Sequence, residues 1–296
     1  MLISIIGSNG LLSSEVGIYC NKNKYSVNTF GLNEPQSHQT NKYYKTDLLN
    51  ESLDFEELVK SDLIVYASGA GIQSNLNESY SDIYLLNTFV PINITKELSK
   101  RSFCGTFVTF GSYFEIGNNN NSVKFTELDL ISSNLNVPND YCISKRLLTR
   151  FVVSQNSSFS HIHLILPTIY GEREGQHRII PYTVNKIKKK ELAEFTNGDQ
   201  IRQYLYVGDV PGIIFSLVEN NFSGVVNVPG VETFSVKEIV KNIFEEFNEV
   251  CDDNSFGTAI RPDLGMKNLQ LSDDLIRKIL KDFRYTKFKE AINKYL

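Results

Sequence analysis

A tyrosine and a lysine four residues apart, Tyr141 and Lys145, could share one face of a helix and do acid–base chemistry together. An ammonium beside a phenol lowers the tyrosine pKa from its ordinary value of about 10, and such a tyrosine can exchange a proton with an alcohol or alkoxide. Ser112 follows the β-rich run 105–110 (GTFVTF), so we expect its hydroxyl at the carboxyl end of a strand. There it can hydrogen-bond the same substrate oxygen. Ser112, Tyr141 and Lys145 are therefore the predicted catalytic residues.

Gly7, Gly10 and Ser13 are spaced three apart, directly after the apolar run 2–6 and before a helical spacing. The first glycine permits a tight turn, and the second lets the backbone approach a pyrophosphate at a helix N-terminus. Ser13 is small enough to keep the helix packed on the strand. The pattern predicts a dinucleotide site, with further contacts from three residues of the turn, Asn9, Leu11 and Leu12.

The end of the second strand normally separates NAD from NADP binding. Residues 27–33 (VNTFGLN) contain no carboxylate, and Gly31 stands where an NAD-type aspartate would be, two residues before Asn33. The missing negative charge leaves room for a 2′-phosphate, although no arginine is there to bind it, and we predict NADPH rather than NADH. Asp47, followed by Leu48, suits an adenine contact because its carboxylate can accept from the exocyclic amine. A helix N-cap is the alternative role for this aspartate.

Short apolar runs alternate with helical spacings along the first half of the chain. The runs predict strands at 2–6, 25–32, 62–68, 105–110 and 161–166, and the spacings predict helices at 13–21, 55–59, 83–100 and 141–154. This order predicts an α/β fold, a Rossmann-type doubly wound parallel sheet.

The regularity weakens after residue 167. We predict helices at 179–190, 235–247 and 273–281 and strands at 205–210 and 225–228. The predicted organisation is an NAD(P)-binding domain over 1–166, to which the chain returns around 203–228, and a smaller substrate-binding domain made mostly from 167–296.

Composition excludes several classes of protein. The 296 residues include 30 Lys+Arg and 34 Asp+Glu, and the net charge of −4 argues against a nucleic-acid or membrane binder held by bulk charge. No apolar run approaches the ~20 residues of a membrane helix, and the N-terminus is typical of a strand. The four cysteines form no CxxC pair, which fits reduced thiols in the cytoplasm, and the four histidines lack metal-ligand spacing. We predict no metal.

These motifs together resemble the extended short-chain dehydrogenase/reductases of the NAD-dependent epimerase/dehydratase family, which act on nucleotide sugars. The resemblance covers nearly the whole chain. It rests on the turn 7–13, on Ser112 five residues before Gly117, on the Tyr141–Lys145 pair and on the segment 202–210 (RQYLYVGDV).

The resemblance also implies which residues contact ligands. Implied cofactor contacts beyond those above are Ala67, Ser68, Gly69, Asn87, Tyr141, Lys145 and Pro167. The predicted substrate contacts are Gln73, Ser112, Tyr113, Arg202 and Arg261, with Arg202 neutralising the substrate diphosphate. Leu166 and Gly208 depart from the family pattern, which many relatives fill with an arginine and an acidic residue. Substrate contacts therefore transfer less securely than the catalytic residues.

The residues after Ser112 bear on the reaction. Similar 4,6-dehydratases carry an Asp-Glu pair there, whereas this chain has Tyr113 and Phe114, which cannot do carboxylate chemistry. Simple reduction needs only a hydride donor and the three catalytic residues. We predict an NADPH-dependent reductase of a nucleotide-linked 4-keto-6-deoxyhexose, supplying a sugar for a bacterial surface polysaccharide such as lipopolysaccharide. The alternatives are a 4-epimerase with tightly bound NAD and a non-catalytic NADP(H)-binding regulator.

The predicted helices 83–100 and 141–154 should lie side by side on one face of the sheet. The second carries more apolar residues than one sheet contact requires, Ile143 and Leu147 among them. Relatives commonly pair these helices across a twofold axis, so we predict a homodimer.

Overall fold

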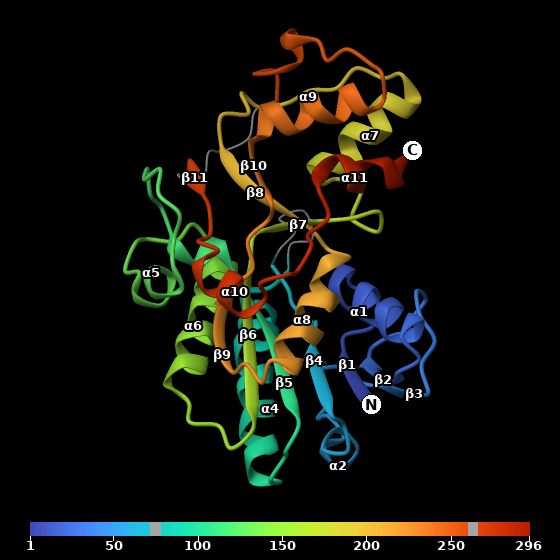
Figure 1. Cartoon of the computed structure of the whole chain (residues 1–296), viewed down its shortest axis with the longest axis vertical. Coiled ribbons are helices and arrows are strands. Elements are labelled where there is room, and N and C mark those ends of the chain that lie inside the picture. Colours follow the sequence, from blue (N-terminus) through green and yellow to red (C-terminus); the bar gives the residue numbers. More distant parts are fainter. Residues whose placement is uncertain (72–77, 260–265) are drawn as a thin grey trace.

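A seven-stranded parallel sheet forms the centre of the computed structural model, which describes residues 1–71, 78–259 and 266–296 (Figure 1). The strand order is β3-β2-β1-β4-β5-β6-β9, with the first strand near the middle. The strands are β1 (Leu2–Ile6), β2 (Ser26–Gly31), β3 (Lys42–Lys45), β4 (Leu63–Tyr66), β5 (Thr106–Ser112), β6 (Ser160–Leu166) and β9 (Gly224–Asn227). The predicted Rossmann-type doubly wound sheet is confirmed.

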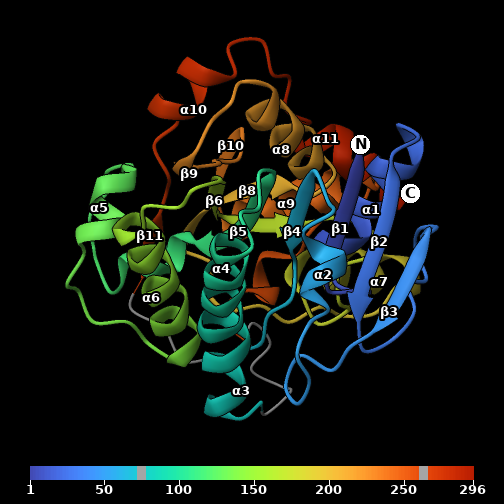
Figure 2. The same cartoon turned by 90° about the horizontal axis from the view of Figure 1, so that it is seen from below.

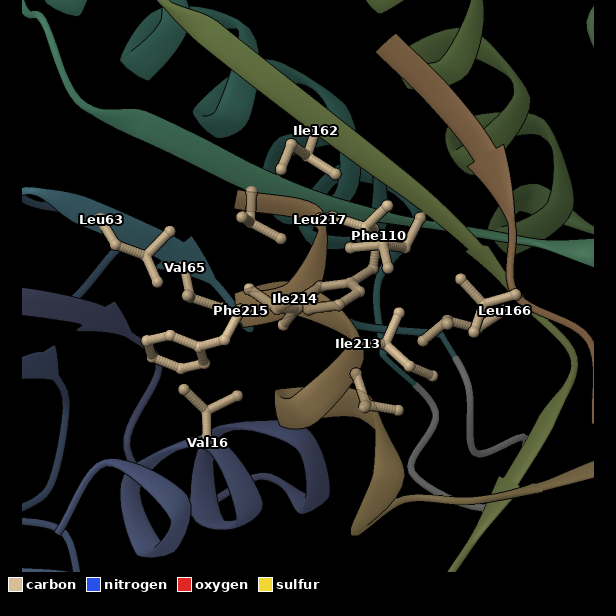
Figure 3. Close-up of a cluster of buried hydrophobic side chains, with 14 of the residues drawn as sticks. Val16, Leu63, Val65, Phe110, Ile162, Leu166, Ile213, Ile214, Phe215 and Leu217 are labelled. Atoms are coloured by element: carbon tan, nitrogen blue, oxygen red, sulfur yellow. The ribbon is translucent and has the colours of Figure 1, made fainter. Parts of the chain in front are cut away.

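Helices cover both faces of this sheet. On one face lie α1 (Leu11–Lys22) and α8 (Asp209–Glu219), whose Val16, Ile213 and Ile214 pack on Val65 and Phe110 of the strands (Figure 3). On the other face lie α2 (Phe55–Leu58), α4 (Val90–Lys100) and α6 (Asp140–Ser154), the last two side by side (Figure 2). Because both faces are covered, the strands read as nearly continuous apolar runs.

A second, smaller sheet lies beyond the carboxyl ends of the central strands (Figure 1). Pro167 is buried and joins β6 directly to its first strand. The sheet comprises β7 (Thr168–Tyr170), β8 (Ile201–Tyr206), β10 (Glu232–Ser235) and β11 (Asn268–Leu269), with β8 paired to the other three. It packs with α7 (Ile179–Lys189), α9 (Val236–Glu246) and α11 (Phe288–Ile292) around a separate core. Short helices α5 (Glu127–Ser132) and α10 (Asp274–Ile279) complete the fold.

Three local features differ from what the sequence predicted. The expected helix 83–100 is three segments: α3 (Tyr80–Tyr84), a π-helical turn (Leu85–Phe89) and α4, which begins beside Pro91. The expected strand 205–210 is instead the end of β8 followed by α8 from Asp209. The edge strand β3 was missed, because its sequence KYYK does not alternate. In the part of the chain that the structure describes, no helix combines the length and apolarity needed to cross a membrane.

Candidate active site

The glycine turn follows β1 and leads into α1. Gly7 has φ +107°, a conformation that only glycine adopts readily, and a Cβ there would lie 2.7 Å from Ser68 Oγ and 3.1 Å from the Ala67 carbonyl carbon. The turn is therefore pressed against the segment after β4, which brings together the predicted contacts Ala67, Ser68 and Gly7. Gly10 caps α1, so Leu11 and Leu12 present the first turn of that helix. The bare backbone of this turn fits the approach of a dinucleotide pyrophosphate.

Gly31 ends β2 beside the same turn. A Cβ at Gly31 would lie 2.6 Å from Ser8 Oγ and 3.2 Å from the Ser8 nitrogen, so an aspartate at this position would require Ser8 to move. Asn33 follows in an exposed connection. Asp47, just after β3, accepts from the backbone N–H of Leu49 at 3.0 Å and from Asn50 at 2.8 Å, and these bonds lower its pKa. The Asp47 carboxylate therefore stabilises the turn that Asp47 begins, and Leu48 packs on the core beside it. An adenine contact from Asp47 or Leu48 stays a prediction.

Asn87 is fully buried in the π-helical turn and connects two parts of the site. Its amide oxygen accepts from the backbone N–H of Ala70 at 3.0 Å, while its nitrogen donates to the Ala70 carbonyl at 2.8 Å and to Ser144 Oγ at 3.0 Å. A Cβ at Gly69 would lie 2.9 Å from Asn87 Oδ1, so glycine leaves room for this contact. Asn87 therefore fixes the exit of β4 against α6, the helix that carries Tyr141 and Lys145.

The three predicted catalytic side chains meet at the carboxyl end of β5. Ser112 is the last residue of β5, and Tyr141 and Lys145 lie one turn apart in α6. The Ser112 hydroxyl lies near the Tyr141 phenol and acts to lower the pKa of that phenol. Lys145 Nζ lies 5.9 Å from the centroid of the Tyr141 ring and donates to the Phe110 carbonyl at 2.9 Å. The arrangement can protonate an oxygen held near Ser112 and Tyr141.

The electrostatics of the pair differ from the sequence-based expectation. Burial raises the pKa of Tyr141, and the neighbouring Ser112 side chain only opposes that rise. Burial lowers the pKa of Lys145 to about 8, while the charge of Glu115 opposes the fall. Desolvation therefore has a larger effect on the Tyr141 pKa than the neighbouring groups, and the Lys145 ammonium donates to the Phe110 carbonyl. That Lys145 lowers the tyrosine pKa during catalysis stays a prediction.

A buried carboxylate lies directly behind the catalytic serine. Glu115 has no exposed surface, and its Oε1 accepts from the Ser112 backbone N–H at 2.6 Å, while its Oε2 accepts from Thr149 Oγ1 at 2.6 Å. Burial raises its pKa to about 7, and the Thr149 and Ser112 hydrogen bonds oppose the rise. Sequence reasoning missed this residue, although a serine followed three residues later by glutamate is the pattern of a capping box.

Two histidines extend this network across β5 and β6. Thr149 Oγ1 lies 2.9 Å from His163 Nε2, and Thr109 Oγ1 lies 2.8 Å from His163 Nδ1 and 3.0 Å from His161 Nε2. An ionised carboxylate can only accept, so with Glu115 charged every hydroxyl and ring N–H must donate toward it. Both histidines are then neutral with the proton on Nε2, which agrees with burial lowering the pKa of each.

Tyr113 and two arginines lie on the side of the second sheet. Tyr113 is buried, and its hydroxyl lies 2.5 Å from Thr168 Oγ1, so it ties the end of β5 to β7. Arg202 donates to the Ile201 carbonyl at 2.8 Å. Burial raises the pKa of Tyr113, and the charges of Arg202 and Arg178 oppose the rise.

Arg178 is a residue that sequence reasoning did not select. It donates to Glu174 at 2.7 Å, and its charge also acts on the Tyr141 phenol. Its position at the start of α7, after the loop from β7, is the signal that could have found it. The predicted substrate contacts Gln73 and Arg261 lie outside the described residues. Within the described ranges, no cluster of three or more His, Cys, Asp or Glu is arranged to hold a metal ion.

Comparison with known proteins identifies the family. The profile of the NAD dependent epimerase/dehydratase family matches residues 3–228. The chain belongs to this family. The resemblance seen in the sequence is thus confirmed.

Two curated relatives are CDP-abequose synthases. The one from Salmonella muenchen is 29% identical over 129 residues, 42% of this chain and 44% of the relative. The one from Salmonella typhimurium is 32% identical over 62 residues, 21% of each chain. The matches therefore span less than half of the length of these relatives.

Solved structures share the whole fold at low identity. A dTDP-glucose 4,6-dehydratase from Bacillus anthracis in complex with NAD superposes with a TM-score of 0.82 at 16% identity, over 100% of this chain and 95% of that one. A UDP-N-acetylglucosamine 4-epimerase from Methanobrevibacter ruminantium, in complex with UDP-N-acetylmuramic acid, gives 0.81 at 16% identity, over 99% and 96%. At this identity the likeness establishes the fold alone.

Proposed function

We propose that the protein is an NADPH-dependent reductase of a nucleotide-linked 4-keto-6-deoxyhexose, acting in the cytoplasm on the way to a bacterial surface polysaccharide. The observation that carries this proposal is the meeting of Ser112, Tyr141 and Lys145 at the end of β5, without an acid–base carboxylate facing them from the residues after Ser112. Glu115 is the one carboxylate in 113–116. It is fully buried with both oxygens engaged, so it is not available to remove a proton from a hexose.

The residues divide the reduction among themselves. The cofactor, when bound at the glycine turn, supplies the hydride. Tyr141 donates its proton to the oxygen at C4, Ser112 orients the carbonyl, and the Lys145 ammonium stabilises the phenolate that is left. Arg202 and Arg178, whose charges both act on the Tyr113 phenol, are the cations proposed to neutralise the substrate diphosphate. The names of the curated relatives favour a cytidine diphosphate sugar.

A panel of nucleotide-linked 4-ketohexoses tests the proposal. NADPH should be consumed with at least one CDP-linked member, and CDP-abequose with NADP⁺ offers the reverse reaction. Consumption with none of them would refute the reductase. Nicotinamide found in the denatured, freshly purified protein, together with interconversion of C4 epimers without added reductant, would establish the 4-epimerase instead. Unchanged biological activity of Tyr141→Phe would establish a regulator.

The proposed assembly is a homodimer through α6 and the π-helical turn. Leu147 and Ile143 of α6 are 44% and 37% exposed, and Phe89 is 58% exposed. These apolar side chains face away from the sheet, on the side that the twofold bundle of relatives would bury. Light scattering at micromolar concentration measures the mass, and a value near the 33.6 kDa of one chain would contradict the dimer.

A further inference from the structure

A cavity of about 240 Å³ opens beside the glycine turn. Its walls are the start of α1, the connection from β2 to β3 and the loop from β7 to α7. The lining residues are Asn9, Gly10, Leu11, Ser14, Gln36, Ser37 and Arg173. The cavity thus lies between the glycine turn, the connection that follows β2, and a segment more than a hundred residues further along the chain.

The β2–β3 connection, which forms one wall of the cavity, is fixed by contacts with the glycine turn and with α1. Asn9 donates to the Glu34 carbonyl at 3.0 Å and accepts from the Gln36 backbone N–H at 2.9 Å. His38 fits against α1 at Gly17, where a Cβ would lie 2.2 Å from the imidazole. Ser37 and Gln36 thus line the cavity from a backbone that Asn9 holds, and the Ser37 hydroxyl lies 3.1 Å from His38 Nδ1.

Arg173 supplies the positive charge in this cavity. The connection 32–41 contains no lysine or arginine, and Gly31 leaves no carboxylate at the end of β2. Arg173 Nη1 donates to Glu15 Oε1 at 2.7 Å, and the arginine side chain remains 50% exposed while that of Glu15 is 10% exposed. Glu15 thus orients the Arg173 guanidinium through a hydrogen bond to only one of its nitrogens. Among the described residues no other hydrogen-bond acceptor is found for Arg173, so its remaining N–H groups are available to a ligand.

We propose that Arg173 binds the 2′-phosphate of NADP(H) in this cavity, together with Ser37 and Gln36. The proposal rests on the NADPH preference of the proposed function and names the residue that confers it. A guanidinium can donate two parallel hydrogen bonds to a phosphate, and a phosphomonoester is the part of NADPH that NADH lacks. The sequence has no lysine or arginine at the end of β2, and Arg173 supplies this positive charge from the loop after β7.

Binding of NADPH and of NADH to the full-length protein tests this assignment without turnover. Calorimetry measures both affinities, and competition by 2′-AMP against 5′-AMP isolates the phosphate. Arg173→Gln should weaken NADPH on the order of tenfold to a hundredfold, as expected for loss of a charge-assisted bond, and change NADH by less than about twofold. Arg284→Gln is the matched control, because Arg284 is 84% exposed and pairs only with Glu290 among the described residues. It should leave both affinities unchanged.

Glu15→Gln should change the NADPH affinity in the opposite direction to Arg173→Gln. It keeps an oxygen that can accept from Arg173 but removes a negative charge next to the phosphate position, so NADPH should bind more tightly than to the unmodified chain. Equal weakening of NADPH and NADH by Arg173→Gln, or no weakening, would overturn the role of Arg173 while leaving the NADPH preference intact. Tighter binding of NADH than NADPH by the unmodified chain would instead refute the preference itself, and this site with it.

Discussion

Thr149→Val tests the buried network behind the catalytic serine. The Thr149 hydroxyl lies 2.6 Å from Glu115 Oε2 and 2.9 Å from His163 Nε2, and 3.2 Å from the Lys145 carbonyl. The hydroxyl has one hydrogen, which it donates to Glu115 Oε2, and its oxygen accepts a hydrogen bond from the N–H at His163 Nε2. Valine has nearly the same shape, so the change deletes the hydroxyl without opening a cavity.

The expected loss of unfolding free energy follows from the two buried groups that lose their hydrogen-bond partner in Thr149→Val. Glu115 loses a donor and His163 loses an acceptor, both with no exposed surface. An unsatisfied buried polar group costs about 1–3 kcal/mol, more when charged, so the variant should lose roughly 2–6 kcal/mol of unfolding free energy. The loss should grow with pH. Because the pKa of Glu115 is raised to about 7, its folded form is protonated in mild acid and becomes a charged, poorly solvated group as pH rises through that value.

Urea unfolding at about pH 5 and about pH 8 measures the effect. Thr95→Val is the matched control: Thr95 is equally buried, but its hydroxyl donates to the Pro91 carbonyl at 2.8 Å, within a helix. That carbonyl lies in a helical turn, so the control should cost less than about 1 kcal/mol. If Thr149→Val is no more destabilising than Thr95→Val at the higher pH, the proposed direction of the hydrogen bonds is wrong.

Three further predictions concern catalysis, the cofactor and assembly. Tyr141→Phe should reduce turnover by about 10²–10⁴-fold with unchanged cofactor affinity, because only the proton donor is lost; a variant within about threefold would refute the mechanism. Gly31→Asp combined with Ser8→Gly, which clears the 2.6 Å contact, should shift the ratio of catalytic efficiencies toward NADH, whereas Gly31→Ala with Ser8→Gly should not. Leu147→Glu should convert the proposed dimer to a monomer in light scattering, and an unchanged mass would exclude this surface.

The central sheet could be predicted because its strands and glycine turn carry local signals. Apolar runs such as 2–6 and 161–166 have the length of buried strands, and Gly7 and Gly10 mark the turn between β1 and α1. Helix α8 was not predicted, because Pro211 and Gly212 lie in its first half. Its apolar residues nevertheless keep helical spacing and are all buried: Val210, Ile213, Ile214 and Leu217. Pro211 is tolerated there because the N–H groups of a first turn need no helical partner.

The candidate site was only partly predictable, because some of its groups meet through long-range packing. Tyr141 and Lys145 could be paired from their spacing alone. Glu115 reads as an ordinary polar residue until burial beneath Ser112 gives it a raised pKa. Arg173 is far from the β2 end in sequence, and only the fold brings it to Asn9 and Ser37. Such contacts depend on the whole topology, which no local window contains.

The position of β9 has a consequence for synthesis of the chain on the ribosome. β9 completes the sheet against β6, but β7, α7, β8 and α8 all lie between these two strands in sequence. Until residues 224–227 have emerged, the apolar strand β6 (SHIHLIL) is a bare sheet edge with unpaired backbone groups. Nascent chains of intermediate length therefore expose a template for aggregation, and chaperone protection is most needed while the second sheet is being translated.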